Sequence, residues 1–176
     1  MSGIAIAPEM MALLEDAGLA WERAQDGSRL DVGPDLWDGF DRWQANPDGS
    51  VDLFAKQERG PGFDHRAWFA SWTYAERWMA RALGAAARGA MPVVGISPFR
   101  EDIDPRCALV EVTVVNRRRI GVRVGEEYIA ALVPHLAAEA THVLLEQTEA
   151  IIRSFRDPEG RPLYGVADIV PPSLRA

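Results

Sequence analysis

The chain has 176 residues, 48% hydrophobic and 26% charged, a composition typical of a globular protein that can bury a core without disulfides or metals. Its formal net charge of −7 argues against a nucleic acid as the main partner, because phosphate binding requires clustered Lys and Arg. The one cysteine, Cys107, excludes an internal disulfide framework and is typical of a reducing compartment. The first residues show no signal-peptide or membrane-span pattern, so we expect a cytoplasmic protein that does not bind a membrane.

The first third of the chain predicts one helix and a small antiparallel sheet. Residues 8–17 begin with a proline, end before Gly18 and carry apolar side chains at helical spacing, so they predict a helix. Four short, partly alternating segments follow, separated by turn-forming Asp-Gly and Gly-Pro pairs. The segments are "LAWERAQ", "RLDV", "GFDRWQA" and "SVDLFAKQ". We expect them to form a four-stranded meander, followed by a glycine-proline linker at residues 59–64.

A long amphipathic helix is predicted over residues 65–88. Its apolar side chains fall on one stripe about 100° wide, which is the width expected of a helix face that packs on a core. The stripe consists of Trp68, Phe69, Trp72, Ala75, Met79, Ala82 and Leu83. We interpret Trp68 and Trp72 as core residues of this central helix rather than as a base-stacking platform.

The second half predicts another group of strands and then helices. A turn-rich passage over residues 95–105 leads into β-rich segments at 107–115, 120–124 and 128–133, with the basic run 117–119 at an exposed hairpin tip. Helices are predicted over residues 134–145 and 147–156. Because strands come in two groups with helices after each, we expect the α+β class. The predicted fold is a single domain over residues 1–176, with two antiparallel β-meanders packed against the long central helix and the C-terminal helices.

No strong catalytic pattern is present: the chain lacks the nucleophile-elbow, phosphate-loop, dinucleotide-binding and CxxC motifs. We interpret Cys107 as a small buried hydrophobic residue. One weaker set consists of His135, Glu139, His142 and Glu146, spaced by four, three and four residues. On an unbroken helix they would share a face and could hold a metal in a metal-dependent enzyme. A polar helix face with His/Glu pairs explains the same spacing.

The passage "SPFREDIDP", residues 97–105, has the composition of a binding loop. It places an aromatic residue, an arginine and three carboxylates between two prolines. Arginine and aromatic residues dominate the energetics of protein interfaces, and a restrained loop loses less entropy on docking. The alternative interpretation is an ordinary solvent-exposed turn.

The C-terminal stretch "SFRDPEGRPLY", residues 154–164, combines a helix end with a chain reversal. Pro158 restricts the residue before it, so the last helix should stop near Arg156, and Gly160 permits a left-handed turn. This stretch resembles the C-terminal signature of a bacterial immunity-protein family that includes the immunity factor of tuberculosis necrotizing toxin. Chain length and the order of the predicted elements are also similar to that family. Only the last stretch matches closely in residues.

The resemblance implies a protein that is not an enzyme and needs no cofactor. Such a protein forms a heterodimer with a cognate secreted NAD-glycohydrolase toxin, blocks the active-site cleft of the toxin and protects the producing cell. In that family a loop of the immunity protein would enter the NAD site. Residues 154–164 would then be scaffold.

The matching loop in this chain is residues 97–104. The toxin-binding residues implied are Ser97, Pro98, Phe99, Arg100, Glu101, Asp102 and Asp104. Phe99 and Arg100 would lie nearest the cleft, and the three carboxylates are included because of the composition of the loop. Arg100 departs from the uncharged polar residue of the family pattern. An arginine there would imitate the positively charged nicotinamide ring or pair with a carboxylate of the toxin.

Overall fold

The computed structural model describes residues 3–37, 39–56, 62–89 and 103–164. In this part of the chain eight strands form one antiparallel sheet, in the order β1-β2-β3-β4-β5-β8-β7-β6. The strands are β1 Ala20–Arg23, β2 Arg29–Gly33, β3 Asp41–Ala45, β4 Val51–Lys56, β5 Phe63–Phe69, β6 Cys107–Val114, β7 Arg117–Val124 and β8 Glu127–Leu132. The helices are α1 Pro8–Asp16, α2 Trp72–Gly89, the short 3₁₀ helix η1 Pro134–Leu136, α3 Ala137–Val143 and α4 Thr148–Arg156.

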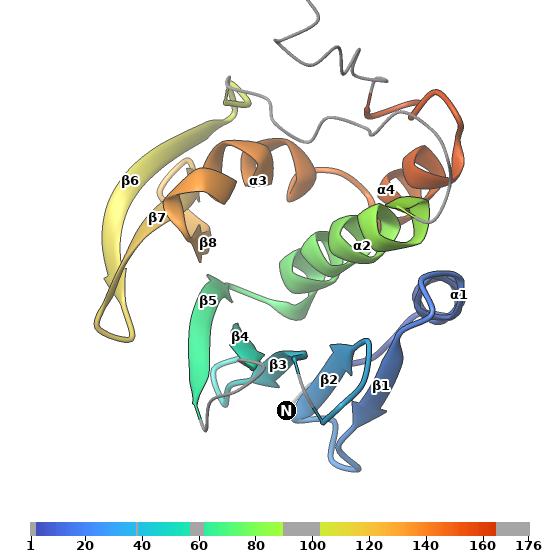
Figure 1. Cartoon of the computed structure of the whole chain (residues 1–176). Helices are drawn as coiled ribbons and strands as arrows, with labels where there is room; N and C mark the ends of the chain where they lie inside the picture. The colour runs from blue at the N-terminus through green and yellow to red at the C-terminus, as the bar shows by residue number, and fades with distance from the viewer. Residues whose placement is uncertain (1–2, 38, 57–61, 90–102, 165–176) are drawn as a thin grey trace, which may run out of the picture.

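The predicted α+β class is confirmed, and the two meanders are joined into one sheet. Strand β5 extends the first meander and pairs with β8 of the second, with Ala67 opposite Leu132 and Phe69 opposite Ala130. The sheet curves, and the helices lie on its inner side with α2 at the centre (Figure 1). No helix in the described ranges is long and apolar enough to cross a membrane.

The prediction of one helix over residues 65–88 is wrong at its beginning. Residues 65–69 belong to strand β5, and the helix starts at Trp72. Burial alternates along the strand, with His65, Ala67 and Phe69 buried, because every second side chain faces the same side of a sheet. Pairing with β4 and β8 on both sides favours the extended conformation in a segment whose apolar spacing also fits a helix.

A predicted linker and a predicted hairpin tip also differ in the structure. Strand β5 begins at Phe63, inside the predicted linker. The basic run 117–119 is not a hairpin tip but the first part of β7, and the tip consists of Val115 and Asn116, both with positive φ. Two such residues match the twist of the strands that they connect. Arg119 is buried and donates to the main-chain carbonyl of His65.

The core lies between the inner face of the sheet and α2. Trp43 is opposite Leu30 on one neighbouring strand and Leu53 on the other, so the three form a row across the sheet. The Trp43 ring stacks on Phe69 with 5.9 Å between ring centroids. Met79 of α2 belongs to the same buried cluster. This arrangement fixes the inner face of the first meander relative to the central helix.

The C-terminal stretch closes the fold against α2. Helix α4 ends at Arg156 as predicted, and Gly160 has a φ of 78°. The buried guanidinium of Arg88 donates to the main-chain carbonyls of Phe155 at 3.1 Å and Asp157 at 2.5 Å. The Tyr164 ring lies 4.9 Å from the Phe155 ring. Residues 154–164 therefore pack against α2 and close the fold, as expected for this stretch.

Candidate functional site

Most of the predicted binding loop lies outside the described residues. Ser97, Pro98, Phe99, Arg100, Glu101 and Asp102 belong to that undescribed part. The structure describes the end of the loop from Ile103 onward, where the chain turns into β6. Asp104 is buried there, with 7% of its surface exposed.

Hydrogen bonds hold the main chain and the side chain of Asp104. Its backbone N–H donates to the Thr141 hydroxyl of α3 at 2.9 Å, and its carbonyl accepts from the Cys107 N–H at 2.9 Å. The Arg106 side chain donates to the two carboxylate oxygens, from Nε at 2.9 Å and Nη2 at 2.7 Å. Thr141 in turn donates to the Ala138 carbonyl at 2.6 Å. The loop end is thereby attached to both α3 and β6.

The Asp104–Arg106 pair is a charged contact close to the surface. Hydrogen bonds from Arg106 hold the pKa of Asp104 at about 2, and the same bonds raise the pKa of Arg106. Arg106 covers the carboxylate while its own side chain remains 56% exposed. The His142 ring nitrogen Nδ1 lies 4.0 Å from the Asp104 carboxylate. The Glu146 carboxylate lies 3.5 Å from the Arg106 guanidinium. At neutral pH Asp104 is therefore an ionised anchor.

A cavity of about 340 Å³ beside this pair brings together three parts of the chain that the sequence singled out. It is lined by Asp104, His142, Glu146, Pro162, Leu163 and Tyr164. They come from the end of the predicted loop, the polar helix residues and the C-terminal signature. Burial raises the pKa of Tyr164, with Glu139 adding to the effect, so this phenol stays neutral. Its hydroxyl has no hydrogen-bond partner in the described part of the chain.

The four residues considered as metal ligands do not share one helix face. His135 lies in η1, before α3 begins. Glu139 is buried and accepts from Arg81 of α2, from Nε at 2.5 Å and Nη2 at 2.9 Å. Burial raises the pKa of Glu139, and the charge of Arg81 opposes that rise. Over the described ranges no group of three or more His, Cys, Asp or Glu side chains is placed to hold a metal ion.

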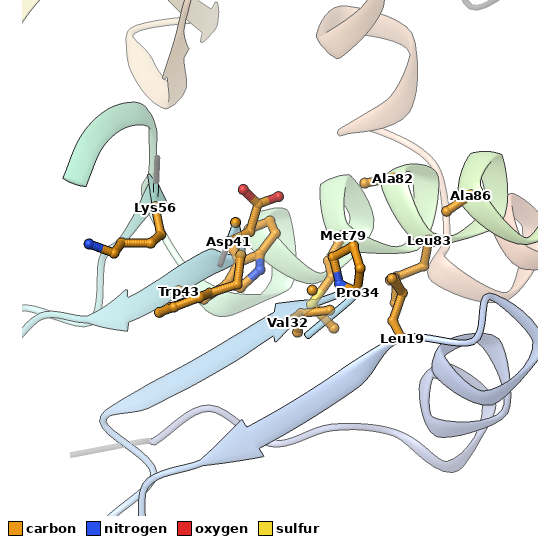
Figure 2. A pocket seen from close by; sticks show the side chains of 13 residues that line it. Leu19, Val32, Pro34, Asp41, Trp43, Lys56, Met79, Ala82, Leu83 and Ala86 are labelled. Atoms are coloured by element: carbon orange, nitrogen blue, oxygen red, sulfur yellow. The ribbon is translucent and has the colours of Figure 1, made fainter. Parts of the chain in front are cut away.

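A second cavity, of about 290 Å³, lies between the first meander and α2 (Figure 2). Most of its lining is apolar, and two charged residues also line it, Asp41 at the start of β3 and Lys56 at the end of β4. This cavity was not predicted from the sequence. The alternation in "DRW" was the available signal, because a strand that turns Trp43 into the core also turns Asp41 to that side.

The fold is similar to that of one solved protein, Rv3902c from M. tuberculosis. The TM-score is 0.82 at 18% sequence identity, and the likeness covers 93% of this chain and 96% of that chain. No family model and no curated protein sequence matches the chain. The two chains therefore share a fold over nearly their whole lengths.

Proposed function

We propose that this chain is an immunity protein that binds a cognate secreted NAD-glycohydrolase toxin and blocks its active-site cleft. It would do so in the cytoplasm of the cell that produces the toxin. The resemblance of residues 154–164 to the immunity-protein family supports this proposal. The observation that carries it is the anchored end of the predicted binding loop, where Thr141 and Arg106 hold Asp104.

Anchoring one end of a loop favours binding because less conformational entropy is lost when the loop docks. Asp104 would act here as a positioning residue, since its carboxylate is already bonded to Arg106 within the chain. Phe99 and Arg100 are the residues proposed to contact the toxin. An aromatic side chain and an arginine are the types that most often supply binding energy at protein interfaces.

The net charge of −7 also suits an inhibitor of this kind. Opposite charge on the toxin would raise the rate of association, and salt would reduce that rate. We therefore propose a toxin with a basic surface around its cleft.

Inhibition of NAD hydrolysis tests the proposal. The purified chain would be titrated into the toxin domain encoded beside its gene, and the rate of NAD cleavage measured at each ratio. We expect complete inhibition near one equivalent, and much weaker inhibition by a Phe99→Ala/Arg100→Ala variant. A matched double variant, Glu149→Ala/Arg153→Ala on the exposed side of α4, should inhibit like the unchanged chain.

Two other outcomes would contradict different parts of the proposal. Absence of both inhibition and a complex on size-exclusion chromatography would contradict the immunity function for that toxin. Full inhibition by the Phe99→Ala/Arg100→Ala variant would keep the function and contradict the role of the loop.

A further inference from the structure

We infer that the cavity between the first meander and α2 binds an ammonium, amidinium or guanidinium group carried on an apolar stem, with Asp41 as its counter-ion. This inference is independent of the proposed function, because it uses no residue of the 97–104 loop. It rests on the register of the sheet, the partners of Asp41 and the chemistry of the cavity wall.

The register places Asp41 in a row of apolar residues that face α2. Trp43, which is 2% exposed, lies opposite Leu30 and Leu53. Two residues earlier on the same strand, Asp41 lies opposite Val32 and Ala55. Residues two apart on a strand face the same side of the sheet. Asp41 therefore lies on the inward-facing side of the sheet at the rim of the cavity, where the residue remains exposed to solvent.

The described part of the chain supplies Asp41 with no hydrogen bond and no ion pair to its carboxylate. Asp41 is exposed to solvent on one side, but the protein packed on its other side raises its pKa, and the charge of Arg66 opposes that rise. The carboxylate of Asp31 on the neighbouring strand, by contrast, has a charged partner. Arg42 donates to its two oxygens at 2.8 Å each. Within the described ranges, Asp31 thus has a paired guanidinium and Asp41 has none.

Figure 2 shows how the cavity would receive such a ligand. Met79 and Leu83 of α2 face the sheet across it, and Trp43 lies next to Asp41. The amino group of Lys56 points away from Asp41 and lies 5.5 Å from the centroid of the Phe63 ring. The apolar wall fits a hydrocarbon or aromatic stem, and the carboxylate fits a cation at its end.

The size of the cavity sets the size of the ligand. A volume of about 290 Å³ corresponds to roughly ten water molecules. One arginine side chain or one small arylamidine has comparable dimensions. The cation could therefore belong to a basic side chain of another protein or to a free small amine, and the test below separates these two sources.

Methyl NMR of the full chain with ¹³C-labelled methionine provides the test. Met79 lines the cavity, and its signal would be assigned with a Met79→Leu variant. Benzamidine serves as the cationic probe, and benzamide serves as a neutral probe of nearly the same shape. We expect benzamidine to shift the Met79 signal in a saturable manner, and benzamide to bind at least tenfold more weakly.

Two variants test the role of Asp41. Asp41→Asn keeps the shape of the side chain and removes its charge, so it should weaken benzamidine binding at least tenfold and leave benzamide unchanged. Glu22→Gln, which removes an exposed carboxylate on β1, should leave both probes unchanged. Circular dichroism would confirm that both variants are folded.

Comparison of agmatine with N-acetyl-arginine methylamide separates the two sources of the cation. Equal binding of the two would indicate a protein side chain, and selective binding of agmatine would indicate a free amine. The inference is overturned if benzamidine leaves Met79 unshifted at its highest soluble concentration, if benzamide binds equally well, or if Asp41→Asn binds benzamidine like the unchanged chain.

Discussion

Gly84 of α2 lies directly against the ring of Phe155 of α4, and a Cβ on Gly84 would overlap the ring atoms. Glycine in the middle of a helix is about 1 kcal/mol less favourable than alanine. The close packing of the two helices accounts for its presence here. Phe155 belongs to the C-terminal signature, so this contact links the signature to the central helix.

We expect Gly84→Ala to destabilise the protein despite the better helix propensity of alanine. Overlap with a packed aromatic ring should lower the free energy of unfolding by about 1–3 kcal/mol. Urea unfolding followed by circular dichroism would measure it. The double variant Gly84→Ala/Phe155→Ala should lose less than the sum of the two single changes, because truncation of Phe155 removes the overlap. A Gly84→Ala variant more stable than the unchanged chain would contradict this packing.

Arg88 is expected to hold the end of α4 in place. Its guanidinium donates to the carbonyls of Phe155, Asp157 and Pro158, a geometry that a lysine cannot reproduce. Arg88→Lys should therefore lower the free energy of unfolding by about 2 kcal/mol, measured in urea. Arg153→Lys, at an exposed position of α4, should change stability little. Equal effects of the two changes would show that the carbonyl contacts contribute nothing.

Because Arg106 binds the Asp104 carboxylate, replacing Asp104 should lower the stability of the protein by an amount that depends on pH. The folded pKa of about 2 lies below the ordinary value of 3.8, so the contribution of this carboxylate is present above pH 4 and is lost as pH falls toward 2. Asp104→Asn should be about 1 kcal/mol less stable at pH 7, since the partner Arg106 is partly solvated. Thermal unfolding should show that the difference in stability between Asp104→Asn and the unchanged chain becomes smaller as the pH is lowered from 7 to 2. A difference that is constant over this range would contradict the assignment.

Breaking the buried pair of Arg81 and Glu139 should also destabilise the protein more at neutral pH than at acid pH. Arg81→Met leaves Glu139 without its partner and should destabilise the protein by about 3 kcal/mol at pH 7. Burial already raises the folded pKa of Glu139 above 4.5. Protonation at low pH removes the unpaired charge, so the loss relative to the unchanged chain should grow as pH rises.

Urea unfolding at several pH values would follow the effect of Arg81→Met. The double variant Arg81→Met/Glu139→Met serves as the control and should recover most of the lost stability, because no charge is then left buried. A loss for Arg81→Met that is the same at pH 4 and pH 7 would indicate lost packing instead of lost charge pairing.

Asp41→Asn is expected to stabilise the free protein slightly. Burial raises the folded pKa of Asp41 above 3.8, so stability falls as pH rises through the interval between the unfolded and folded values. Removal of the charge should raise the free energy of unfolding at pH 7 by no more than about 0.5 kcal/mol, the usual range for an exposed site. Thermal unfolding would measure the gain, and a loss of stability would show that Asp41 has a partner in the fold.

Local signals in the sequence predicted most elements of this protein. Pro8 and Gly18 mark the limits of α1, and Pro158 and Gly160 mark the end of α4 and the turn after it. Alternating apolar residues predicted strands β1 to β4 and β6 to β8. These features depend on neighbouring residues, because backbone restrictions and side-chain periodicity act over a few positions.

Contacts between distant residues decided the rest. Trp68 and Phe69 fit a helix and a strand equally well by spacing, and pairing of β5 with β4 and β8 selected the strand. Glu139 has its partner 58 residues away, which separates it from the proposed metal-binding face. The sequence by itself determined the α+β class and the limits of most elements. Only the tertiary structure decided that the two meanders form one sheet and that Asp41 faces a cavity, because those features depend on pairings that no local window contains.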